Sequence, residues 1–400
     1  MTRFHHQQLA CIAVAWAVSN CFLMVSLQPV LFRVLIDSAG MSLTSSSAVL
    51  SANMLGGLIG NLGALFTLNN ARVKPVLAGA AALLAAAQGF MAVVPATPGC
   101  LMVLMFCAGI GAGLLGAVAL ATIVGMNRPT RVFSLAVVAQ IVTGAASTYI
   151  APKVMSAFGV DGLYVSLAAM ALLVLPTISW VIDLVPSRAE GGNSAREKAH
   201  PAATGHLLLL LLSVAIVYLS NNAIWPYLEL ILGRGGMRPE QIATAISIGQ
   251  FASCAGAIAA SRWERNSHGF GIAIGLALMA AATALFTIVH GVVAASIDVA
   301  VLMGSLYFAV PLILGTLALF DSRGRLVVWS QLAMGAGLAS GPFAASVIVE
   351  HRSLDALLWA STFTCCLALS VALLAFRRLT YVELSGTCKA SFDCCNADRR

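Results

Sequence analysis

Three asparagines interrupt long apolar runs of this 400-residue chain. Asn20 lies near the middle of the run at 8–32, and Asn221 and Asn222 lie near the middle of the run at 206–232. Because an asparagine loses its hydrogen bonds to water in an apolar surrounding, each side chain needs either a ligand in a cavity or a partner on a neighbouring helix. Adjacent helical positions point about 100° apart, so Asn221 and Asn222 cannot both face one cavity.

Aromatic side chains would form the wall of such a cavity. We expect the asparagine amides to hydrogen-bond a small-molecule substrate, with an apolar and aromatic wall made by Trp225, Tyr227 and Tyr307. The alternative is that the asparagines join neighbouring helices, through bonds typically worth under about 2 kcal/mol each. Both interpretations predict that the asparagines point away from lipid.

Two charged residues, Arg33 and Glu229, close the same two apolar runs and are candidates for gating or coupling. An ion pair between them would latch that end of the molecule. In the alternative, Arg33 pairs with Asp37 four residues on, and Glu229 lies against Arg234. A further alternative is proton coupling, with Glu229 as the carboxylate that takes up the proton.

The elements that position these residues follow from composition. The chain is 60% hydrophobic and 9% charged, with a mean hydropathy of +0.94, whereas about a quarter of residues are charged in a water-soluble domain. Runs of roughly 20 apolar residues cross the lipid bilayer as helices, and these runs lack the alternation of barrel strands. The sequence predicts an all-α membrane protein with twelve spans, near 8–32, 46–68, 75–95, 100–126, 132–156, 162–184, 206–232, 240–261, 269–290, 294–320, 326–349 and 354–377.

Lysine and arginine predict the orientation. With a cytoplasmic N-terminus, 17 of the 22 Lys and Arg residues fall on the cytoplasmic side and 5 on the other. This bias places both termini and the central loop in the cytoplasm. The net charge of +7 then needs no nucleic-acid partner, because its excess is the topological bias itself.

The chain also repeats itself. "GMSLTSSSAVLSANMLGGLIG" at 40–60 aligns with "GMRPEQIATAISIGQFASCAG" at 236–256, at an offset of 196. "NRPTR" and "DSRGR" align at an offset of 194. We therefore expect two pseudo-symmetric six-helix halves. The predicted organisation is a half at 1–185, a linker at 186–205, a half at 206–378 and a disordered tail at 379–400 that carries reduced thiols.

This organisation resembles the major facilitator superfamily of the bacterial type. The turn "GALFTLNNARVKP" keeps Gly63, Arg72 and Lys74 of the family's Gly-rich basic loop, with Thr67 where the usual aspartate falls. The resemblance implies a central cavity lined by spans 1, 4, 7 and 10 and opened alternately to each side. It also implies a multi-pass protein of the inner (cell) membrane, acting as a monomer. The glycines of span 4 favour close helix packing over a hinge: Gly109, Gly111 and Gly113.

The function predicted is secondary transport. No nucleophile motif, phosphate loop or paired metal-ligand spacing occurs, so we expect no enzyme activity, no metal and no cofactor. The middles of the spans lack charged residues, which favours a small neutral or amphipathic organic substrate. Efflux fits such compounds, whereas uptake of a neutral nutrient, or a sensor that binds without flux, are the alternatives.

Overall fold

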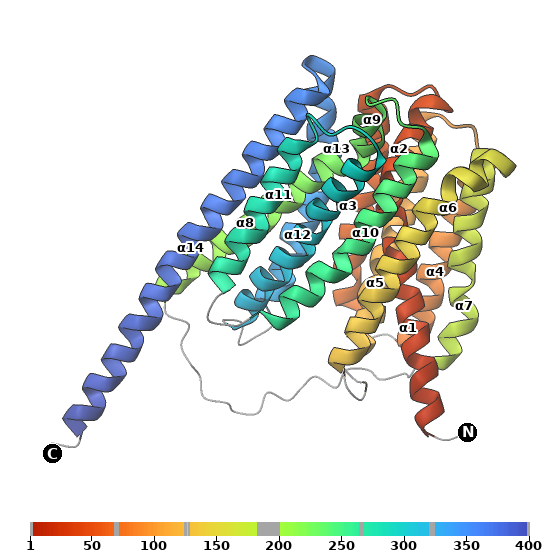
Figure 1. The fold of residues 1–400 in the computed structure, drawn as a ribbon. Coiled ribbons are helices and arrows are strands. Elements are labelled where there is room, and N and C mark those ends of the chain that lie inside the picture. Colours follow the sequence, from red (N-terminus) through yellow and green to blue (C-terminus); the bar gives the residue numbers. More distant parts are fainter. Residues whose placement is uncertain are drawn as a thin grey trace.

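The computed structural model describes residues 3–67, 72–123, 126, 129–181, 201–263, 268–319 and 325–397. These residues form helices and short turns, and no strand occurs among them. Two groups of helices make up the bundle (Figure 1). The first group contains α1 (Arg3–Ser26), α2 (Gln28–Asp37), α3 (Leu43–Thr67), α4 (Val73–Met91), α5 (Pro98–Ile123), α6 (Pro129–Leu172), α7 (Val174–Thr177) and η1 (Ile178–Trp180). The second contains α8 (Pro201–Ile224), η2 (Trp225–Tyr227), α9 (Leu228–Gly233), α10 (Pro239–Arg262), α11 (His268–Leu285), α12 (Val292–Leu319), α13 (Arg325–His351) and α14 (Leu354–Ala397).

Ten helical segments of the described chain are long and apolar enough to cross a membrane. The expectation of an all-helical, multi-pass membrane protein is therefore confirmed. One of the ten, Leu135–Trp180, covers the fifth and sixth of the predicted runs. The second predicted run corresponds to α3, which has 25 residues and is not among the ten.

Gly159 divides α6 into two limbs. Its φ of 71° and ψ of −175° lie far from helical values, in a region that glycine enters readily because it lacks a Cβ. The two predicted runs at 132–156 and 162–184 thus meet at a bend and not at an extended loop. Pro152 lies within the first limb without breaking it.

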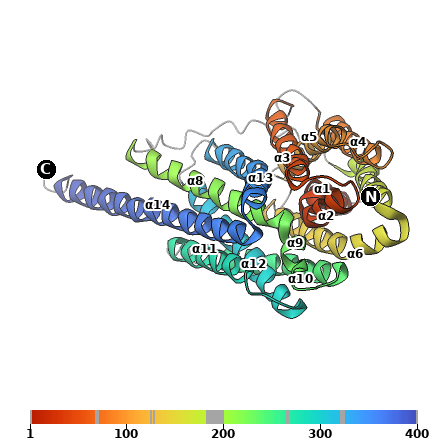
Figure 2. The same ribbon diagram turned by 90° about the horizontal axis from the view of Figure 1, so that it is seen from above.

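The two groups repeat one pattern of helix contacts. In the first group α3 and α4 pack on α5, while α1 and α4 pack on α6. In the second group α10 and α11 pack on α12, α8 packs on α13, and α11 packs on α14. The groups lie side by side, as the view along the bundle shows, and they meet where α3 packs on α13 and α6 on α10 (Figure 2).

Glycines let the central helices of each group pack backbone to backbone. A Cβ added at Gly109 or Gly113 of α5 would overlap the backbone of α3, and one added at Gly60 would overlap the backbone of α5. The second group has an equivalent contact, where a Cβ at Gly256 of α10 would overlap Gly304 of α12. Small residues permit this close approach in membrane helices. The span-4 glycines therefore pack, as their spacing predicted.

Prolines break the first helix of each group at corresponding places. α1 ends at Ser26 and α2 begins at Gln28, with Pro29 in its first turn. In the second group η2, which contains Pro226, separates α8 from α9. A proline lacks the N–H that a helix needs and crowds the preceding turn, which explains both breaks. Pro311 lies inside the continuous helix α12.

The C-terminal segment differs from its expectation. Residues 379–397, predicted to form a disordered tail, continue the last helix, because α14 runs from Leu354 to Ala397. Once a helix has formed, each further residue adds one backbone hydrogen bond at little cost. Polar composition alone therefore did not end this helix, which projects beyond the bundle (Figure 1).

Candidate functional site

Both chain termini lie at one end of the bundle, and α2 and α9 lie at the other (Figure 1). We call these the terminal end and the closed end, respectively. The hydrogen bonds that join the two groups run from the level of Ser26 to the closed end. The site between the groups is thus sealed on one side by direct contacts.

The inner layer of this seal uses carbonyl groups at the break after α1. The Trp225 indole Nε1 donates to the Val25 carbonyl at 2.7 Å. The Gln250 amide Nε2 donates to the Ser26 carbonyl at 3.2 Å and to the Thr148 hydroxyl at 3.1 Å. Residues of η2 and α10 in the second group therefore bind the broken span of the first.

The outer layer is aromatic and polar. The Tyr227 hydroxyl shares a hydrogen bond of 2.9 Å with Ser47 of α3. Its ring lies 4.4 Å, centroid to centroid, from the ring of Phe32. Beyond them, the Thr44 hydroxyl donates to the Glu350 carboxylate of α13. Tyr227, expected to line the cavity, is fully buried in this seal.

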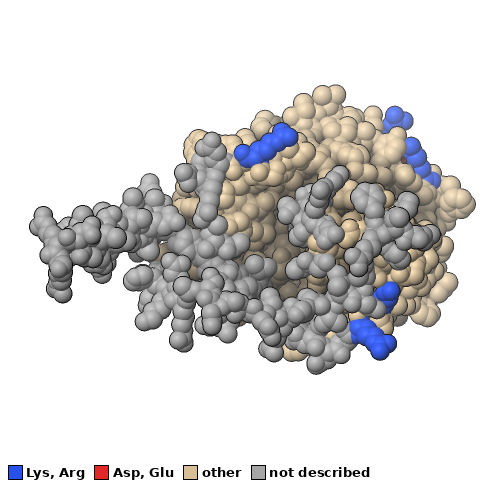
Figure 3. All heavy atoms as spheres, turned by 90° about the horizontal axis from the view of Figure 1, so that it is seen from below, with Lys and Arg blue, Asp and Glu red and all other residues tan. Residues whose placement is uncertain are grey.

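The terminal end is open by comparison. Figure 3 looks onto this end and shows a hollow near its middle, with Lys and Arg side chains on the surrounding surface. Tyr307 of α12, the third aromatic residue predicted to line the cavity, lies close to Tyr218 of α8 and Cys254 of α10. Tyr218 and Tyr307 are only partly buried although they lie inside the bundle.

The three asparagines have different surroundings. Asn20 donates to the Trp16 carbonyl of its own helix at 3.0 Å. Asn222 donates to the Leu338 carbonyl of α13 at 2.6 Å, which joins two helices of the second group. Asn221 is 7% exposed, and its Oδ1 finds no hydrogen-bond partner among the described residues. The Asn222 Oδ1 is likewise without a partner in the described part of the chain, so the two residues differ in that the Asn222 amide nitrogen binds a neighbouring helix.

Arg33 and Glu229 are not joined in this structure. Arg33 pairs with Asp37 at 2.8 Å, and this hydrogen bond raises the pKa of Arg33 above its ordinary value. Glu229 is 6% exposed, and its Oε2 has no hydrogen-bond partner within the described part of the chain. The Arg33–Asp37 pair is the alternative that the sequence offered to the latch.

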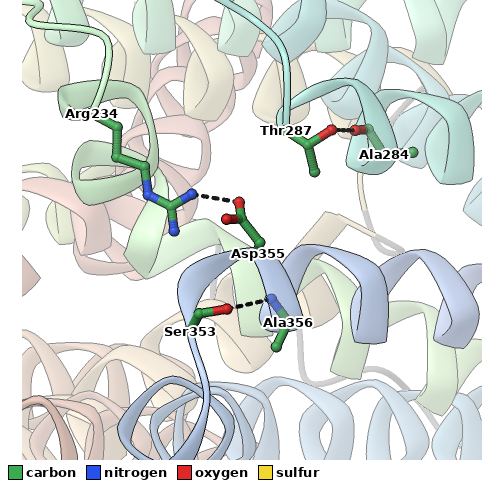
Figure 4. A network of polar contacts seen from close by, with 6 residues as sticks. All are labelled: Arg234, Ala284, Thr287, Ser353, Asp355 and Ala356. Atoms are coloured by element: carbon green, nitrogen blue, oxygen red, sulfur yellow. Dashed lines mark hydrogen bonds and ion pairs between the residues drawn. The ribbon is translucent and has the colours of Figure 1, made fainter.

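Arg234 does not accompany Glu229 either. Its guanidinium pairs with Asp355 of α14 at 2.6 Å (Figure 4). Ser353 lies beside this pair, and its hydroxyl accepts a hydrogen bond from the Ala356 N–H, which caps the start of α14 (Figure 4). The pair thus ties the end of α9 to the start of α14, both in the second group.

Sequence reasoning missed a carboxylate. Asp298 stands six residues inside α12, is 4% exposed, and has no hydrogen-bond partner for either carboxylate oxygen among the described residues. Asp298 lies near the outer end of the predicted run at 294–320. The signal was present in "VVAASIDVAVLMG", where Asp298 is the single charge. Gln28, at the break of the first span, is likewise buried with both amide atoms unpartnered in that part of the chain.

The residues of the predicted basic turn lie at the terminal end. Gly63 has open space beside it, and Arg72 is exposed at the N-terminus of α4. The Lys74 ammonium donates to the Ser179 carbonyl of η1 at 3.5 Å. The turn itself, at 68–71, lies outside the described residues.

A separate cavity of about 330 Å³ lies between the two limbs of α6 and Leu27. Its lining is mostly aliphatic, with hydroxyl groups from Thr143, Ser147 and Ser166. No cluster of three or more metal-ligating side chains occurs among the described residues. We take the contacts between the two groups of helices as the candidate site, because they bring together polar atoms from both groups.

No protein-family model matches this chain, and no curated protein is similar to it in sequence. The class of protein therefore has to be inferred from the fold and its apolar helices. The chain is a multi-pass, all-helical membrane protein of transporter-like build.

Proposed function

We propose that this protein is a secondary transporter of the major facilitator type, with two six-helix halves that open a central site alternately to each side. It moves a small neutral or amphipathic organic molecule, and its direction is efflux. The observation that carries the proposal is the asymmetric seal: direct hydrogen bonds join the groups at the closed end, while the terminal end is hollowed (Figure 3).

The repeated contact pattern supports the two halves. Each pairing of helices in the first group has a counterpart in the second, and the groups meet through α3 with α13 and α6 with α10. Two similar bodies that meet mainly through two helix pairs can tilt against each other without disturbing their own packing. The structure then corresponds to the state whose cavity opens at the terminal end.

Charge supports the orientation. Arg72 and Lys74 lie at the terminal end, and Figure 3 shows Lys and Arg side chains on that face. Basic residues favour the cytoplasmic side, so the cavity of this state faces the cytoplasm. The protein then lies in the cell (inner) membrane. Efflux begins with this state, because it admits substrate from the cytoplasm.

The site chemistry supports a neutral substrate. Asn221, near the middle of its apolar run, offers an unpartnered hydrogen-bond acceptor, and Trp225 follows about one helical turn further along the chain. Glu229 and Asp298 lie nearer the closed end of their helices and are the candidates for proton coupling. No nucleic acid and no resident cofactor enters this proposal, and a monomer suffices for it.

A flux assay tests the function. Purified protein is reconstituted into vesicles of both orientations, and a panel of neutral and amphipathic compounds is followed with and without a pH gradient. We expect movement out of the cytoplasmic-facing compartment, reduced in an Asn221→Ala variant. Net movement the other way would make the protein an importer, and saturable binding with no flux would make it a sensor. Either result would contradict efflux.

A further inference from the structure

The proline break in the first span presents one carbonyl group with no donor from its own helix. In a continuous helix the Val25 carbonyl would accept the N–H of the residue four positions on, but that residue is Pro29, which has none. Two nearby carbonyls are served locally, since the Leu27 N–H donates to the Leu23 carbonyl and the Leu31 N–H donates to the Leu27 carbonyl. Pro29 thus leaves a vacancy in the ladder at Val25.

A residue of the other group fills this vacancy. The Trp225 Nε1 lies 2.7 Å from the Val25 carbonyl oxygen, and Trp225 is itself buried. Trp225 owes its position to the second break, because it begins η2 directly before Pro226. The two proline breaks therefore face each other across the interface, one supplying the acceptor and the other the donor.

We propose that Pro29 acts as the acceptor-forming half of a latch: by withholding an N–H from Val25 it makes the carbonyl available to Trp225 and so sets how firmly the closed end is shut. A buried donor or acceptor left unpaired is costly, so parting of the groups strands both atoms until water reaches them. This inference deepens the proposed function, on which it rests only in assuming that the two groups move apart.

The latch has a second contact that does not depend on Pro29. Gln250 binds the carbonyl of Ser26, the next residue along, together with the Thr148 hydroxyl. In the proposed scheme Gln250 supports closure in every variant, so removing the Trp225 bond weakens the seal without abolishing it. This makes the closed-to-open ratio a graded and measurable quantity.

The experiment is a double-mutant cycle in which the distance between two spin labels reports whether the closed end is open or shut. Spin labels are attached through Ser42→Cys and Arg352→Cys, two exposed positions on opposite groups beside the Thr44–Glu350 contact, in a background without the native cysteines. Trp225→Phe keeps a ring but removes the donor, and Pro29→Ala supplies the missing N–H to Val25. Each should raise the open-to-closed ratio roughly 5- to 30-fold, the effect of one buried hydrogen bond.

The coupling decides the proposal. In the Pro29→Ala background Trp225→Phe should have little further effect, because the indole has already lost its acceptor. Pro311→Ala, a proline of a continuous helix, is the matched control and should leave the distances unchanged. Additive effects of the two substitutions, or a control that shifts as much as Pro29→Ala, would overturn the latch.

Two safeguards keep the result interpretable. If Pro29→Ala yields no folded protein, Trp225→Phe alone decides, and a distance distribution equal to that of the parent would overturn the proposal. The measurement uses no substrate, so a failed latch leaves the flux assay unaffected. Conversely, a working latch in a protein without flux would contradict only the proposed function.

Discussion

Asn221 and Asn222 differ in what their side chains bind. Asn222 binds the Leu338 carbonyl through its amide nitrogen and so joins α8 to α13, while the Oδ1 atoms of both asparagines have no partner within the described residues. A single step along a helix turns a side chain by about 100°, which separates a packing position from a cavity position. The role of an asparagine in such a span therefore depends on the face of the helix that it occupies.

The two asparagines make a matched pair for mutation. Asn222→Ala should lower the free energy of unfolding by about 1–3 kcal/mol, because it strands a buried carbonyl. Asn221→Ala should leave thermal unfolding near that of the parent and reduce transport by about one to two orders of magnitude, as expected when a site loses a polar group that binds substrate. Melting curves in detergent and initial transport rates measure the two effects. The opposite assignment, with Asn221 needed for folding, would move the substrate site elsewhere.

At the scale of the elements, α3 and α5 pack directly against each other at glycine residues. α3 approaches α5 so closely that a Cβ at Gly109 or Gly113 would overlap backbone, while Gly63 on the same helix α3 has open space beside it. The three residues look alike in sequence. Their different surroundings separate packing glycines from the glycine of the predicted basic turn.

This difference predicts the outcome of three alanine substitutions. Gly109→Ala and Gly113→Ala should each lower the unfolding free energy by about 1–3 kcal/mol or more, because backbone cannot move aside for the added carbon. Gly63→Ala should be tolerated, or slightly stabilising, since alanine favours the helix. Thermal melts of the three variants, expressed in parallel, compare them directly. Equal destabilisation by Gly63→Ala would contradict the packing assignment.

Sequence reasoning was strongest for elements and weakest for partners. Composition and run length predicted the helices, which the structure interrupts at Pro29 and Pro226. It did not find that Trp225 binds Val25, because that contact joins residues 200 positions apart. Nor did it find Asp298 as a candidate, since burial depends on how α12 packs in three dimensions. The disordered tail was wrong because local polarity does not stop a helix that is already formed.

For the whole molecule, the seal and the hollow predict which positions meet water. In a cysteine-free background, Ser47→Cys and Gln28→Cys should resist impermeant thiol reagents from either side, because both residues are buried at the closed end. Tyr218→Cys, at a partly buried position of α8, should react only from the side that carries the chain termini. Labelling yields from sealed vesicles of each orientation provide the measurement. Rapid reaction at Ser47→Cys from the far side would show that the molecule rests in the other state.

The glycine seams also govern the mechanics of the protein. Where two backbones touch directly there is no side chain to change rotamer, so each seam has one packing arrangement and deforms little. We therefore expect each group to move as a rigid body. Most of the flexibility then lies in the motion of one group relative to the other. Such a molecule should relax as a single slow process of microseconds to milliseconds. Its kinetics would be insensitive to substitutions on the lipid-facing surface and acutely sensitive to those at the interface.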